Sequence, residues 1–192
     1  MKKLVLIALI PLAACVRFGA EPPPALMTLT PAAAVPVGRE QKSADARTVT
    51  LTVPVVPQEL AVTRVPVRSA GTRVTYVKDA QWVEPPARMF ARLLADTVTA
   101  QTPLVVLGAR QFQVDPGAML SGELRSFTID ADTQEAVVVY DAALIREGVA
   151  GVEKRRFEAR EPVTAVEADA VGTALNTAAN RVASDVATWL SR

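Results

Sequence analysis

A pair of alternating segments in the second half of the chain restricts the fold more than any other feature of the sequence. Residues 118–130 and 135–147 each place apolar side chains at alternate positions over most of their length, and the polar residues 132–134 lie between them. Because successive side chains of a strand point to opposite faces, this pattern predicts a long β-hairpin with one buried face. The rest of the chain must then provide a second layer to cover that face.

Two segments with helical spacing can form this layer. Residues 86–100 carry apolar side chains three or four positions apart, beginning with Pro86, which suits the first turn of a helix. Residues 165–190 show the same spacing. Shorter apolar or alternating runs predict further strands at residues 48–53, 72–77, 104–107 and 152–163.

We therefore predict one domain of the α+β class, an α/β sandwich in which two helices pack on a mixed β-sheet of five to six strands. The order strand, helix, strand over residues 72–107 predicts parallel pairing of its two strands through a right-handed crossover. Pro66 disfavours a central strand in the segment that precedes residue 72.

The amino terminus has the pattern of a bacterial lipoprotein precursor. Two lysines precede an apolar run at residues 4–10, which is much shorter than the roughly 20 residues of a bilayer-spanning helix. Pro11 follows, and then Leu12-Ala13-Ala14-Cys15, where small residues stand directly before the cysteine. We predict a signal peptide at residues 1–14 and lipidation of Cys15, whose acyl chains would hold the protein to a membrane. The alternative is a free cysteine in an apolar segment.

The segment after Cys15 is expected to be a tether. Residues 15–46 are rich in Pro and Ala without a sustained period, and they lead to a folded domain at residues 47–192. The run at residues 26–29 could instead form an edge strand, so that the domain would begin near residue 26. Val16 stands where aspartate favours inner-membrane retention in enterobacterial lipoproteins. Because valine and not aspartate stands at this position, we predict an anchor in the outer membrane, with the domain facing the periplasm.

Several classes of function are excluded by composition. The chain has no histidine and one cysteine, which removes histidine-dependent triads, Cys/His dyads and most zinc sites. Its nine glycines form no phosphate-binding loop, and its net charge of +1 does not favour nucleic acid as a partner. Asp130, Asp132 and Glu135 lack the glycine and the spacing of a calcium loop, so a solvated turn is the better interpretation. We predict no enzyme activity, no metal and no cofactor.

Two groups of residues are candidates for partner binding. Tyr76 and Trp82 flank the connection from a strand to a helix, where an exposed aromatic pair would suit a binding surface, with core packing as the favoured alternative. The basic run 154–156 could contact lipid headgroups or an acidic partner. Acidic residues flank this run, however, and alternate strand residues point to opposite faces, which favours a solvated strand.

Residues 74–86, which read Val-Thr-Tyr-Val-Lys-Asp-Ala-Gln-Trp-Val-Glu-Pro-Pro, enter a helix that carries Phe90, Leu93 and Leu94. Together with the lipobox and the tether, this segment resembles the ABC-type transport auxiliary lipoproteins, the paraquat-inducible protein C-like family. The resemblance covers about residues 26–190. It implies an accessory subunit of a mammalian-cell-entry (MCE) type lipid transporter, with an MCE protein, a permease and an ATPase as partners, and it leaves homo-oligomerisation open. The alternative is a structural or envelope-assembly lipoprotein with a generic binding domain.

Overall fold

The computed structural model describes residues 25–108, 111 and 117–192, which form seven strands and two α-helices. The strands are β1 (Thr48–Leu51), β2 (Arg64–Ser69), β3 (Arg73–Gln81), β4 (Val105–Leu107), β5 (Ala118–Asp130), β6 (Glu135–Ile145) and β7 (Glu153–Pro162). The α-helices are α1 (Pro86–Gln101) and α2 (Ala168–Leu190), and two short 3-10 helices are η1 (Ser43–Asp45) and η2 (Gln58–Leu60). The bounds of β5 agree with the predicted first arm of the hairpin.

The long strand β5 organises the sheet. Along one edge it pairs antiparallel with β6, which pairs in turn with β7. Its other edge is shared by β1 and β2, which both run parallel to it at opposite ends, and Val55 bridges to Glu123 between them. β4 lies outside β1, and β3 lies outside β2. A strand of 13 residues is long enough to hold two shorter neighbours end to end.

The sheet has one strand more than the five to six predicted, and the additional strand is β2. Pro66 lies within it, although proline cannot donate a hydrogen bond to a neighbouring strand. The structure accommodates Pro66 because the pairing of β2 with β5 begins only at Val67, and the pairing with β3 has a register shift between Arg64 and Pro66. The proline thus lies before the short stretch of β2 that is paired on both edges.

The predicted parallel pairing across residues 72–107 is wrong. β3 forms an antiparallel hairpin with β2 at one end of the order β3-β2-β5-β1-β4, while β4 lies at the other end and pairs in parallel with β1. The unexpected strand β2 reverses the chain before β3, and α1 then carries the chain across the sheet from β3 to β4.

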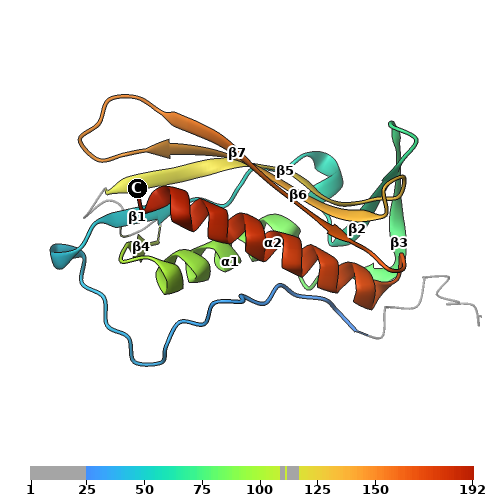
Figure 1. Ribbon diagram of the computed structural model, residues 1–192, viewed down its shortest axis with the longest axis horizontal. Coiled ribbons are helices and arrows are strands. Elements are labelled where there is room, and N and C mark those ends of the chain that lie inside the picture. Colours follow the sequence, from blue (N-terminus) through green and yellow to red (C-terminus); the bar gives the residue numbers. More distant parts are fainter. Residues whose placement is uncertain (1–24, 109–110, 112–116) are drawn as a thin grey trace, which may run out of the picture.

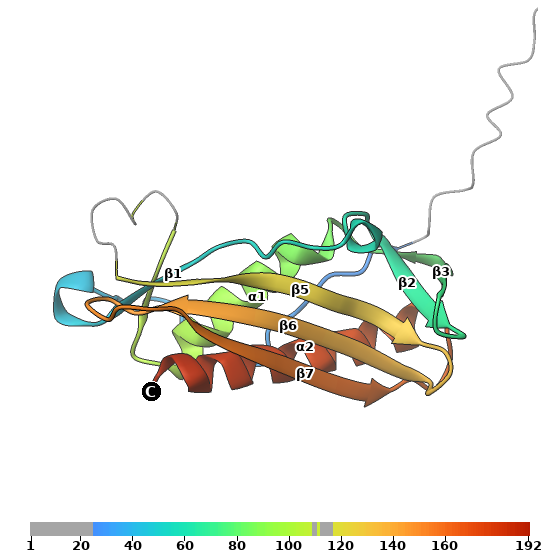
Figure 2. The ribbon, with the colours of Figure 1, turned by 90° about the horizontal axis from the view of Figure 1, so that it is seen from above.

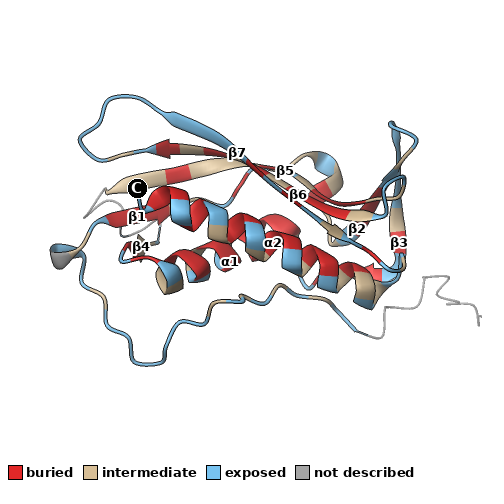
Figure 3. Cartoon of the chain, viewed as in Figure 1, coloured by how far each residue is buried: buried red, intermediate tan, exposed pale blue. Residues whose placement is uncertain are grey.

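Both helices pack on one face of the sheet, which confirms the predicted class of an α+β sandwich (Figure 2). α1 lies beside α2, and α2 also contacts β6 and β7. Both helices bury one side and expose the other (Figure 3). The largest side chains in the core include Phe90 from α1, Leu175 from α2, and Phe127 and Tyr140 from the sheet. No helix in the described part of the chain is long and apolar enough to cross a membrane.

Residues 27–41, which we call the strap, lie along the helices instead of standing free (Figure 1). The strap begins as a parallel bridge between Met27 and Trp82, with hydrogen bonds of 2.8 and 2.9 Å to the backbone on either side of Trp82. The side chain of Met27 packs on Gly172 of α2, where a Cβ atom would come within 2.9 Å of its sulfur. Met27 therefore joins the strap both to the strand end at Trp82 and to α2.

Two asparagines of α2 hold the next part of the strap. Asn180 accepts a hydrogen bond from the amide of Ala32 at 2.7 Å and donates one to the carbonyl of Thr30 at 2.9 Å. Asn176, one turn earlier, accepts a hydrogen bond from the amide of Thr30 at 2.9 Å. The side-chain amide of Asn180 thus takes the place of a neighbouring strand, because it offers the strap both a donor and an acceptor.

Candidate functional site

The face of the sheet that points away from the helices is polar and hollowed. Alternation places Leu120, Leu124 and Tyr140 toward the helices, so their neighbours in sequence point outward. The outward side chains and the adjoining backbone line an open trough of about 790 Å³. Residues that line this trough include Val55, Ser121, Glu123, Asp141, Lys154 and Arg156.

The floor of the trough lies below the charged walls because the residues of the floor have small side chains. Ser121, Gly122 and Ala143 lie between the charged residues of the walls. Gly122 is required by packing beneath the floor, where a Cβ atom would approach the carbonyl oxygen of Asp141 to 2.3 Å and the Tyr140 ring to 2.7 Å. The Tyr140 hydroxyl donates a hydrogen bond of 3.0 Å to the carbonyl of Ser121. Burial raises the pKa of this tyrosine well above its usual range.

The walls of the trough are connected by ion pairs. Arg156 of β7 donates two hydrogen bonds to the carboxylate of Asp141, at 2.6 and 2.7 Å. Arg125 approaches Asp141 at 3.6 Å and Glu123 at 3.3 Å. The hydrogen bond with Arg156 lowers the pKa of Asp141, although partial burial acts in the opposite direction. Lys154 also lines the trough and forms no ion pair with any residue that the structure describes.

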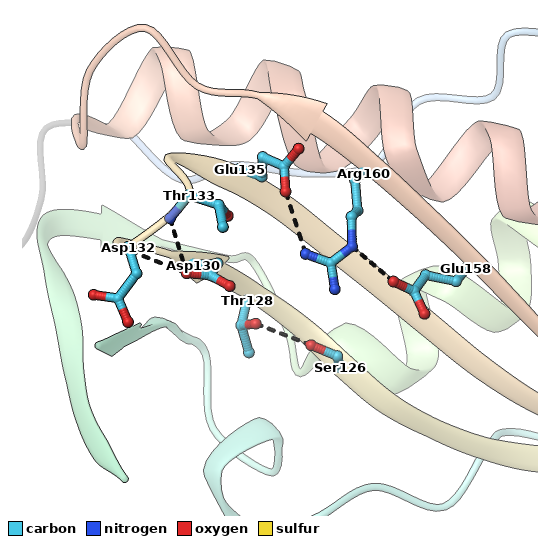
Figure 4. A network of polar contacts seen from close by, with 8 residues as sticks. All are labelled: Ser126, Thr128, Asp130, Asp132, Thr133, Glu135, Glu158 and Arg160. Carbon is cyan, nitrogen blue, oxygen red and sulfur yellow. Dashed lines mark hydrogen bonds and ion pairs between the residues drawn. The ribbon is translucent and has the colours of Figure 1, made fainter. Parts of the chain in front are cut away.

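A second polar network lies further along the same three strands (Figure 4). Arg160 of β7 binds Glu158 at 2.7 Å and Glu135 of β6 at 3.2 Å. The Asp130 carboxylate accepts hydrogen bonds from the backbone amides of Asp132 and Thr133, at 3.0 and 3.2 Å, and so closes the turn between β5 and β6. No cluster able to hold a metal ion occurs among the described residues.

The aromatic candidates from the sequence lie away from the trough. Trp82 is 1% exposed and packs edge to face against Phe127, with 5.5 Å between the ring centroids, so it occupies a core position. Tyr76 is half-buried on β3, and the guanidinium group of Arg64 lies 3.8 Å from its ring centre. The two are therefore not a joint exposed surface. Cys15 lies outside the described residues.

The basic run 154–156 lies at the trough. All three residues contribute to the lining of the trough, but Arg155 also lies over the ring of Phe157, with 5.1 Å from its guanidinium carbon to the ring centre. Sequence reasoning did not select the other charged residues of the trough, Glu123 and Asp141. Their only signal is that they occupy outward positions of alternating strands. The asparagines that hold the strap had a clearer signal, because asparagine is a weak helix former and two stand one turn apart within α2.

The comparison with protein families decides the identity of the domain. The family model described as the ABC-type transport auxiliary lipoprotein component matches residues 28–187, from the first residues of the strap to the last turn of α2. The chain belongs to this family. The auxiliary lipoprotein family is a transport component and not a known enzyme family. A search of curated proteins finds no match to the chain.

Solved structures show the same fold for this auxiliary lipoprotein. Protein XCC0632 from Xanthomonas campestris, of the family DUF330, aligns with a TM-score of 0.70 at 16% identity, over 86% of this chain and 94% of that protein. An uncharacterised protein aligns with a TM-score of 0.65 at 19% identity, over 76% and 92% of the two chains. The hypothetical protein CT253 from Chlamydia trachomatis aligns with a TM-score of 0.51 at 9% identity, over 76% and 96%. At these identities the similarity describes the fold alone.

Proposed function

We propose that this auxiliary lipoprotein is an accessory subunit of an MCE-type ABC transport system, and that it positions the transport machinery in the periplasm. Cys15 is the proposed anchor, in the outer membrane in preference to the inner membrane. The family match over residues 28–187 carries this proposal, because it covers the strap, the sheet and both helices. The role is non-enzymatic and uses no cofactor.

The trough is the surface proposed to meet the MCE protein or its permease. The helices and the strap occupy one face of the sheet, which leaves the trough on the opposite face accessible. Its Lys154 has no ion-pair partner among the described residues, and Val55 on the opposite wall is 67% exposed. A cation and an apolar side chain across a hollow of small residues suit a protruding loop with an acidic side chain.

Co-purification tests this role. The tagged protein, solubilised in mild detergent from cells that express it naturally, should bring down an MCE protein and its permease. Ser121→Trp fills the trough and Lys154→Glu reverses its free charge, so each should reduce recovery of these partners at least tenfold. Lys42→Glu makes the same charge change on the strap side of the domain and should leave recovery unchanged.

Recovery of neither partner at normal protein stability would contradict the transport role. Recovery of envelope-assembly proteins in their place would support the structural alternative. If both partners are recovered equally with all three variants, the role stands and the trough is not the docking surface. Mass spectrometry of the mature amino terminus tests the anchor separately, since an unmodified Cys15 or an intact Met1 would exclude it.

A further inference from the structure

A second cavity, which we call the end pocket, lies beside Leu190 in the last turn of α2. Figure 1 shows the C-terminus at this end of the sandwich. The end pocket has a volume of about 260 Å³ and is more enclosed than the trough. It lies where β1, β5 and β6 meet the last turn of α2, so its walls come from both layers. Its apolar lining consists of Val49, Leu104, Ala118, Leu144, Val149 and Leu190.

Charged side chains also line the end pocket. Arg47, Arg146 and Glu147 contribute to its walls. Among the residues that the structure describes, Arg47 donates a hydrogen bond from Nη2 to the carbonyl of Ser191 at 3.2 Å. Arg146 uses Nε and Nη2 to bind Glu153, at 2.7 and 3.4 Å. A guanidinium group has five N–H donors, so both arginines keep donors that these contacts do not use.

An apolar cavity with arginine donors in its wall has the chemistry of a site for an amphiphile. The apolar walls favour an alkyl chain, because burial removes each methylene group from water. The unused guanidinium donors favour a carboxylate at one end of that chain, since the planar fork matches its two oxygens. A group of the size of a water molecule occupies about 30 Å³. The volume of about 260 Å³ therefore holds an alkyl chain of roughly nine carbon atoms.

We propose that the end pocket binds a single saturated alkyl chain with a carboxylate head group, which is a fatty acid of medium length. The chain lies between α2 and the sheet, and the carboxylate meets Arg47 and Arg146. Val149, which is 58% exposed on the connection between β6 and β7, forms part of the entrance. The proposal is independent of the docking role, because the end pocket and the trough share no lining residue.

Photochemical labelling tests this proposal with the mature lipoprotein held in phosphatidylcholine nanodiscs. The probe is decanoic acid with a diazirine at its terminal carbon, and mass spectrometry identifies the labelled peptides. Saturated fatty acids of 4 to 14 carbons compete with the probe, with their free concentrations measured. The labelled peptides should be those that line the end pocket. Competitor affinity should rise about fourfold for each methylene up to roughly ten carbons and then level off.

Three variants complete the test. Ala118→Leu fills the cavity and should reduce labelling at least tenfold. Val149→Asp places a negative charge at the entrance and should also reduce labelling at least tenfold, whereas Val149→Lys, its matched control, should not reduce it. Position 149 is exposed, so this pair remains informative even if Ala118→Leu fails to fold.

Three results would overturn the proposal. One is labelling outside the end pocket, and another is equal labelling in both Val149 variants. The third is a fourfold gain in competitor affinity per methylene that continues to 14 carbons. Such a gain would mean that the fatty acid binds a surface that does not limit the length of the chain.

Discussion

Replacing Gly122 with alanine tests whether the floor of the trough and the core beneath it share one tightly packed layer. The new Cβ atom would lie 2.3 Å from the carbonyl oxygen of Asp141 and 2.7 and 2.8 Å from two carbons of the Tyr140 ring. The carbonyl cannot yield cheaply, because Asp141 is paired on both edges of β6, with Glu123 of β5 and with Arg156 of β7. The ring is also confined, since Phe90 lies 5.3 Å away, measured between the ring centroids.

The expected loss of stability follows from these contacts. Overpacking a filled core costs up to about 3 kcal/mol. Displacing the Tyr140 ring would also break its hydrogen bond with the carbonyl of Ser121, at a cost of about 1 kcal/mol. Alanine recovers at most about 1 kcal/mol, because it loses less backbone entropy than glycine in a strand. The net loss of about 3 kcal/mol should lower the melting temperature of a domain of this size by roughly 6–12 °C.

Thermal unfolding followed by circular dichroism measures this shift. Gly71→Ala is the matched control, because a Cβ atom there meets nothing within 4 Å and the strain comes only from its positive φ of 76°. That strain costs about 1–2 kcal/mol, which corresponds to roughly 2–8 °C. If Gly122→Ala lowers the melting temperature no more than Gly71→Ala does, the tight packing of Tyr140 over Gly122 is refuted.

Three further predictions concern the strap and two titrating groups. Asn180→Asp removes the amide donor to the carbonyl of Thr30, so the strap should detach from α2 more often. Hydrogen exchange at the Ala32 amide should then rise about tenfold, whereas Thr177→Ala, on the exposed side of α2, should leave this exchange rate unchanged. Because the folded-state pKa of Asp141 is lowered, its stabilisation should be complete above about pH 4 and lost as the pH falls through the lowered pKa. In urea unfolding at a series of pH values, Asp141→Asn should flatten this loss of stability, and an unchanged pH profile would contradict the role of Asp141. Because burial raises the folded-state pKa of Tyr140, its stabilisation should be complete below about pH 10 and lost at higher pH. In a Tyr76→Phe variant, where Tyr140 is the one tyrosine left in the sequence, absorbance near 295 nm should change only when the protein unfolds, and an earlier change would contradict the burial of Tyr140.

The regular part of the fold could be predicted because its signals are local. The alternation over residues 118–130 gave both ends of β5, and the spacing after Pro86 gave α1 to within one residue of its end. Both elements are long and have one buried side, so period and burial agree. The segment 74–86 also indicated the correct family, because its aromatic and proline spacing is unusual.

The missed features depend on contacts between distant residues. β2 was not expected because a proline argues against a strand, and only its pairing with β5 shows that Pro66 lies outside the doubly paired stretch. Only the run at residues 26–29 was considered as an edge strand, and Met27 does form a bridge with Trp82. The rest of the strap shows no period in its sequence, and the side chains that hold it, Asn176 and Asn180, follow it by 146 residues or more. The trough likewise combines residues from three strands, so no single segment of sequence contains its pattern.

The path of the strap would have a mechanical consequence if the proposed anchor at Cys15 tethers the chain. The strap enters beside Gly172, in the second turn of α2, and follows the helix toward its other end, past Asn176 and Asn180. Tension on the tether along the axis of α2 would load these bonds in shear, so that several would have to break together instead of one after another. A domain held in this way would follow movements of the proposed anchor as a rigid body.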